Sequence, residues 1–104
     1  MGKNKDIGEL TNLMAKALRH KIGSIVNKDE LYASKYAKDA ESIMAEAEKV
    51  LLRQNWNSYN KLKIKEELRA KLRKELEQKD FLDNKKFDIM DNEIEKALKE
   101  FDLG

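Results

Sequence analysis

Residues 61–76, KLKIKEELRAKLRKEL, decide the fold, because apolar side chains recur there at every fourth position. This row consists of Ile64, Leu68, Leu72 and Leu76. Side chains at this spacing share one face of an α-helix. A helix with such a stripe is marginal in water on its own, so the stripe must pack against other helices. The stretch therefore predicts a helix over residues 58–78 that contributes to a helical core.

Apolar stripes with three- and four-residue steps also occur on both sides of this helix. They predict further helices near residues 6–25, 29–53 and 86–102. The chain has no proline and only four glycines, which leaves little turn chemistry for a β-sheet fold. We therefore predict an all-α fold, either a four-helix bundle or an irregular helical array.

Several residues define the expected ends and faces of these helices. Asp6 is placed to cap the first helix, and Gly23 is placed to end it. Between the second and third helices, the amides and hydroxyl of residues 54–58 favour a helix break over a helix interior. We expect Ile25, Tyr32 and Leu62 to be buried with the stripes.

Composition excludes several classes of protein. A length of 104 residues predicts a single helical domain over residues 1–104, either complete or part of a larger protein. The absence of cysteine excludes disulfides, thiolate zinc sites and cysteine nucleophiles, and it favours the cytoplasm. No apolar run approaches the roughly 20 residues of a membrane-spanning helix. We therefore predict a cytoplasmic protein that does not interact with membranes.

No arrangement of reactive residues predicts catalysis. His20, the only histidine, has no triad pattern around it and is expected at the surface. Residues 88, 91 and 95 place carboxylates on one helical face, as a divalent cation would require, but acidic residues near a helix start are explained equally by the helix dipole. We predict no catalytic residue, no metal site and no cofactor, although the sequence leaves open whether the protein is part of an enzyme.

Charge is balanced over the whole chain, at a net +2, but not locally. Residues 61–79 carry +4 and residues 80–104 carry −4. Four bases stand at four-residue intervals beside the buried row: Lys61, Lys65, Arg69 and Arg73. This basic row is able to contact nucleic-acid phosphates. Pairing with nearby acids, including those of the last helix, is the stronger interpretation, because the domain lacks a strong basic excess.

Trp56 and Tyr59 flank the helix break before the basic row. Aromatic side chains there are able to stack on bases. A lone tryptophan at a helix boundary more often closes one end of a core, with its indole N–H donating to a carbonyl or to water.

The segments Asn55-Trp56-Asn57 and Glu66-Glu67-Leu68-Arg69-Ala70-Lys71-Leu72-Arg73 resemble the C-terminal helical region of type I restriction enzyme motor (R) subunits. In that family a tryptophan-containing turn leads into a helix with an Arg-Ala-Lys/Gln-Leu-Arg core. The resemblance covers about residues 50–76. It implies a domain of a larger type I restriction endonuclease and ATP-dependent translocase, whose catalytic modules lie outside these residues. Arg69, Lys71 and Arg73 belong to the matched motif, and the resemblance implies that they serve assembly.

The functional prediction is a non-catalytic helical interaction module. The resemblance implies that it docks the motor onto the methyltransferase and specificity subunits, and that it also contacts DNA. The alternative is a small nucleic-acid-binding protein that uses the basic row. The expected contact residues for a partner or for DNA are Trp56, Lys61, Lys65, Arg69, Lys71 and Arg73. A monomer and a homodimer bury the same stripes, so the sequence leaves the oligomeric state open.

Overall fold

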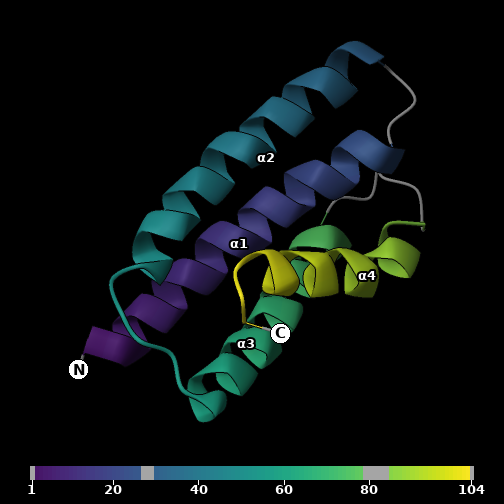
Figure 1. The fold of residues 1–104 in the computed structure, drawn as a ribbon. Coiled ribbons are helices and arrows are strands. Elements are labelled where there is room, and N and C mark those ends of the chain that lie inside the picture. Colours follow the sequence, from purple (N-terminus) through teal and green to yellow (C-terminus); the bar gives the residue numbers. More distant parts are fainter. Residues whose placement is uncertain (1, 27–29, 79–84, 104) are drawn as a thin grey trace.

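The computed structural model describes residues 2–26, 30–78 and 85–103. These residues form four α-helices and no strand, which confirms the all-α prediction (Figure 1). The helices are α1 (Gly2–Val26), α2 (Glu30–Leu51), α3 (Ser58–Glu77) and α4 (Lys85–Glu100).

The first helix, α1, is the centre of the arrangement, with α2 on one side and α3 on the other (Figure 1). α2 runs antiparallel to α1, whereas α3 runs in the same direction as α1. α4 turns back along α3 and also contacts α1. Within the described ranges, α2 has no close backbone contact with α3 or α4. Of the two predicted architectures, the molecule therefore has the irregular helical array. It measures 42 × 22 × 21 Å.

The apolar row of α3 is completely buried, as its spacing predicts. Its four side chains pack into a core with residues from all three other helices. The largest of these fully buried partners are Ile7, Leu10, Met14, Ile22, Ile94 and Leu98. Since α1 and α4 supply nearly all of these large side chains, the densest part of the core lies between α1, α3 and α4.

The start of α3 follows from the amide-rich break that precedes it. Asn57 is the N-cap, and its side chain accepts a hydrogen bond of 2.8 Å from the backbone N–H of Asn60. The Asn60 side chain returns the contact by accepting from the backbone N–H of Asn57 at 3.2 Å. This reciprocal capping box satisfies two N–H groups that the helix itself leaves unpaired.

The predicted start of α1 is wrong, and neither of its expected cap residues serves as a cap. α1 begins at Gly2, and Asp6 lies inside the helix, where it is buried. Its carboxylate accepts a hydrogen bond of 2.8 Å from Gln54 and lies 3.5 Å from Arg53, beyond the end of α2. Asp6 therefore serves tertiary pairing instead of capping. Arg53 lies outside α2, which ends at Leu51 instead of near residue 53.

At the other end, α1 continues past Gly23 to Val26. Gly23 is buried, and a Cβ added to it would lie 3.2 Å from the Tyr36 ring of α2. The glycine permits a close approach of α2 and has no role as a helix cap. Asn27 and Asp29, whose side chains are suited to cap the start of α2, lie outside the described residues.

Three apolar side chains expected in the core are exposed: Ile25 at 52%, Tyr32 at 54% and Leu62 at 56%. Leu62 precedes Ile64 by two residues, which turns it to the opposite face of α3. Tyr32 lies on the first turns of α2, where only α1 is near enough to cover it. Ile25 lines an open groove that is described below.

The end of α4 places Phe101 and Leu103 against the core. Asp102 has a φ of 58°, and its backbone N–H donates to Lys99 O at 3.1 Å. The backbone N–H of Leu103 donates to Leu98 O at 2.7 Å. These two bonds form a Schellman motif, which ends the helix at Glu100, two residues before the predicted end.

Candidate functional site

The basic row on α3 is largely paired with acids of the same molecule. Lys65 Nζ lies 2.8 Å from Glu95, and Arg69 Nη2 lies 3.2 Å from Asp91; both acids are on α4. Arg73 Nε lies 3.2 Å from Glu77, one turn further along α3. These pairs are exposed, so each contributes little stability, but they neutralise the row locally.

Only one member of the row, Lys61, is without such a contact. Its side chain forms no ion pair or hydrogen bond with any residue that the structure describes. Counting contacts within the described residues, the row therefore offers one unpaired cation in place of the four that the sequence presents.

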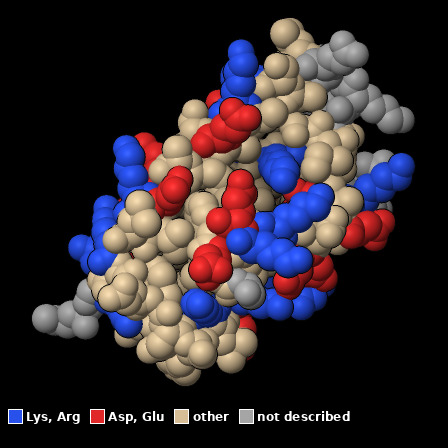
Figure 2. Space-filling model, in the orientation of Figure 1, with Lys and Arg blue, Asp and Glu red and all other residues tan. Residues whose placement is uncertain are grey.

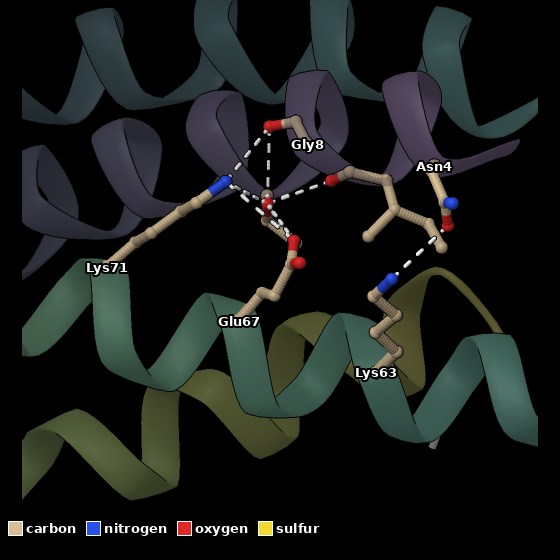
Figure 3. A network of polar contacts seen from close by, with 7 residues as sticks. Asn4, Gly8, Lys63, Glu67 and Lys71 are labelled. Carbon is tan, nitrogen blue, oxygen red and sulfur yellow. Dashed lines mark hydrogen bonds and ion pairs between the residues drawn. The ribbon is translucent and has the colours of Figure 1, made fainter. Parts of the chain in front are cut away.

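Lys71 is held inside the α1–α3 interface (Figure 3). Its Nζ donates to Thr11 Oγ1 at 2.6 Å and to Gly8 O at 3.2 Å, and lies 3.9 Å from Glu67. The buried Thr11 hydroxyl in turn donates to Ile7 O at 2.8 Å. Because its ammonium group has these internal acceptors, Lys71 joins two helices, and contact with an external partner would compete with that role.

Trp56 closes one end of the core. Its indole Nε1–H donates to Leu51 O at 2.8 Å, and its partly buried ring packs against the apolar cluster. Tyr59, on the first turn of α3, is exposed. The structure thus places the two aromatic residues in different environments, and only Tyr59 presents most of its ring to solvent.

The only histidine lies between α1 and α2 instead of at the surface. The His20 side chain is 18% exposed, its Nδ1 lies 4.0 Å from Asp39 Oδ2, and its ring meets that of Tyr36 edge-on at 5.7 Å. The surface position expected for His20 is therefore wrong, because α2 covers it.

An ion pair between an exposed lysine and a buried carboxylate joins α1 to α4. Glu93 is 3% exposed, and its Oε1 lies 2.6 Å from Lys21 Nζ. Lys96 Nζ approaches the other carboxylate oxygen at 3.2 Å. Burial alone raises the pKa of Glu93, but the hydrogen bonds and the attraction from Lys21 and Lys96 outweigh that effect and lower the pKa below its usual value. Glu93 is therefore ionised at neutral pH and holds Lys21 in place.

A groove runs between α2 and the carboxyl end of α4, above α1. Its volume is about 630 Å³ and one side is open to solvent. The floor and walls include Ala17, Leu18, Ala40, Met44, Ala97 and Phe101. It exists because, among the described helices, α2 packs against α1 alone and none fills the angle between α2 and α4.

Carboxylates surround this apolar floor. Glu41 and Glu48 of α2 and Glu100 of α4 line the groove, and all three are exposed. None of them forms an ion pair within residues 2–26, 30–78 and 85–103. The lysine that lines the groove, Lys21, is paired with Glu93. Figure 2 shows acidic side chains along α2 and near the end of α4 on this face.

A second, smaller hollow lies between α1 and α3. Its volume is about 340 Å³. It is lined by Asn12, Lys16, Lys71, Lys74, Glu75 and Gln78, among others. Glu75 is paired with Arg19 at 3.3 Å, whereas Lys16 and Lys74 have no ion pair among the described residues. The hollow therefore has a basic lining.

Sequence reasoning missed the groove, although its signal is visible in α2. Ala37, Met44 and Ala45 form a second apolar stripe beside the buried one, interrupted by Glu41 and Glu48. Alanines at such positions let a neighbouring helix approach closely. The described part of the chain provides no such helix on this side.

The described residues contain no group of three or more histidine or acidic side chains positioned to hold a metal ion. Within those same residues, no helix has the length and apolarity required to cross a membrane. Comparison with protein-family models, with curated proteins and with solved structures finds no match for this chain. The geometry of the surface is therefore what points to a function for this chain.

Proposed function

We propose that this chain is a helical docking module and that its contact surface is the groove between α2 and α4. The observation that carries the proposal is an open apolar groove of about 630 Å³ on a small domain whose other large apolar side chains are mostly buried. Grooves of this kind bind protein segments through their apolar side chains, while polar groups at the edges set orientation.

The charged surface of α3 is less suited to docking. Lys65, Arg69 and Arg73 have acidic partners within 3.2 Å, and Lys71 donates to α1. An external anion would have to compete with these internal contacts. The groove requires no such exchange, because its rim carboxylates have no ion-pair partners among the described residues.

The resemblance of residues 50–76 to type I restriction enzyme R subunits supports a specific form of this proposal. In that form the module belongs to a motor subunit and docks it onto the methyltransferase and specificity subunits. Trp56, followed by the capped helix α3, has the tryptophan-turn and helix order of the resembled region. Size-exclusion chromatography with a reconstituted methyltransferase–specificity complex tests this form, and separate elution of the two would contradict it.

Site-specific photo-crosslinking tests the docking proposal itself. A photoreactive amino acid replaces Ala45, which is exposed at the groove, or Ala70, which is exposed on α3 as a matched control. In cells that produce the chain naturally, we expect a discrete crosslinked species from position 45 that is absent at position 70. The additional substitution Ala37→Gln should weaken it. Equal products at both positions, or none at either, would contradict the use of the groove.

The basic hollow favours a second candidate function, nucleic-acid binding. Lys16 and Lys74 are free to contact phosphate, with the amides of Asn12 and Gln78 beside them. We therefore expect Lys16→Glu with Lys74→Glu to weaken any binding of a labelled duplex at low salt more than Lys65→Glu with Arg69→Glu does. If Lys65→Glu with Arg69→Glu weakened binding more, the basic row would be the candidate nucleic-acid site instead. An affinity that neither pair of substitutions changes would remove this candidate.

A further inference from the structure

We infer that the partner segment in this groove is an amphipathic α-helix whose apolar stripe is flanked by lysine or arginine. The inference rests on the proposed docking function and identifies the chemistry of its partner. It draws on three features of the described residues: the charge of the rim, the shape of the floor and the way the chain uses its own basic helix.

The rim has an excess of acidic groups, and these have no internal ion-pair partners among the described residues. Glu41, Glu48 and Glu100 lie on both sides of the groove and have no ion pairs among the residues that the structure describes. Lys21 is the single basic residue among the lining residues, and its ammonium is engaged by Glu93 at 2.6 Å, so the lining has three carboxylates against one lysine. Cations that flank a bound apolar stripe would meet three unpaired carboxylates, whereas acidic flanks would be repelled.

The floor has the dimensions of a short helix. The lining of α2 extends from Ala37 to Glu48, which corresponds to about 16 Å along the helix axis at about 1.5 Å per residue. This is the length of about three turns. Alanines at the floor allow a close approach of a second backbone. The flexible Met44 side chain can adapt to apolar residues of different shape.

The same features exclude other occupants on chemical grounds. Nucleic acids and anionic lipid surfaces carry the wrong charge for this rim. A second copy of the chain lacks the required surface within the described residues, because its basic helix, α3, buries its apolar row completely in its own core. The occupant is therefore a basic amphipathic helix from outside residues 1–104.

Two synthetic peptides test the inference against the intact chain. Both carry the same three-turn apolar stripe, one with lysine flanks and one with glutamate flanks, and fluorescence anisotropy measures their affinity. At low salt we expect the lysine peptide to bind at least about tenfold more tightly, because it adds about three favourable charge contacts where the other adds repulsion. The difference should shrink in high salt as the charges are screened.

Substitutions in the chain locate the effect. Removing the rim charges in Glu41→Gln, Glu48→Gln and Glu100→Gln should abolish most of the preference while the chain stays folded, since all three side chains are exposed. Ala37→Gln with Ala45→Gln introduces neutral bulk at the groove and should weaken the lysine peptide about tenfold or more. Ala70→Gln, the same change on the exposed face of α3, should have no effect.

The possible outcomes separate the inference from the docking proposal. Equal affinity for the two peptides, or tighter binding of the glutamate peptide, would overturn the inference and leave the groove as a docking site. If neither peptide binds but the crosslink at position 45 is retained, the inference is likewise overturned and the groove remains a docking site. A dimer in sedimentation equilibrium that Ala37→Gln with Ala45→Gln dissociates would identify a second copy as the occupant and overturn the inference.

Discussion

Both α2 and α3 lie along α1, but they bury different side chains there. α3 buries Ile64, Leu68, Leu72 and Leu76 with no exposed surface. α2 buries mainly Ala40, Ala47 and Val50, while Met44 is only partly covered. α4 covers the second side of α3, and no helix of the described chain covers the second side of α2.

The charges of the two helices differ in the same way. Lys65, Arg69 and Arg73 of α3 have acidic partners, but Glu41 and Glu48 of α2 have none within the described residues. The more conspicuous basic helix is therefore the structural one. The alanine-rich helix α2 is the one that leaves a face open, and the proposed docking groove lies on that face.

The largest expected difference between the two helices is in their contribution to stability. Leu68→Ala should lower the free energy of unfolding by about 2 to 5 kcal/mol, since the side chain is fully buried and leaves a cavity. Met44→Ala, at the half-open groove, should cost about 1 kcal/mol or less. Urea denaturation measures both values. Equal losses would mean that α2 is packed as tightly as α3.

The ion pair between Lys21 of α1 and Glu93 of α4 gives the next stability difference to be measured. Lys21→Met leaves the buried Glu93 carboxylate with Lys96 alone, and should cost about 1 to 3 kcal/mol at neutral pH. Lys96→Met is the matched control, and its loss should be smaller, because Lys96 lies further from Glu93 and is more exposed.

The same pair predicts a pH dependence. The pKa of Glu93 is lowered in the folded state, despite the opposing effect of burial, by its contacts with Lys21 and Lys96. Its contribution is therefore present above the unfolded pKa of about 4.3 and is lost as the pH falls through the lower folded value. Urea denaturation at neutral pH and at about pH 3 should show the cost of Lys21→Met shrinking in acid. A cost that grows in acid would contradict this assignment.

The sequence predicted the elements that depend on local pattern. The α3 row has a strict four-residue period, and the amides at Asn55 and Asn57 mark the helix break, so both were found. The groove could not be predicted, since it depends on where α4 ends relative to α2, which is a tertiary property. For the same reason the cap roles of Asp6 and Gly23 were wrong: distant residues of α2 and its following turn determine their environment.

Substitutions of Lys71 and Lys61, two of the predicted contact residues, test whether the internal contacts of such a lysine stabilise the fold. Lys71→Met removes the donor to Thr11 and Gly8 and should cost about 1 kcal/mol. Lys61→Met, on the same helix but without a polar contact in the described residues, should change stability by less than about 0.5 kcal/mol. Thermal denaturation measures both. If the two variants are equally stable, the contacts of Lys71 contribute no net stability and its ammonium is available to a partner.

The smallest expected effects on stability come from substituting two glycines of α1, Gly8 on the side of α3 and Gly23 on the side of α2. Gly8 is contacted through its carbonyl by Lys71 of α3, and an added Cβ would meet nothing within 4 Å. Gly8→Ala should therefore stabilise the chain by about 0.5 to 1 kcal/mol, the usual gain in a helix interior. Gly23→Ala makes the same backbone change, but its Cβ would lie 3.2 Å from the Tyr36 ring, which must shift.

Since Tyr36 is only partly buried, on a helix whose one close neighbour among the described helices is α1, we expect the ring to yield in part and the net gain to be close to zero. Tyr36→Ala removes the obstacle, so in that background Gly23→Ala should recover the gain seen at Gly8. A large loss of stability from Gly23→Ala alone would show that α2 is held against α1 as firmly as α3 is. A full gain would show that α2 moves freely on α1, and either result would contradict the intermediate packing that keeps the groove open.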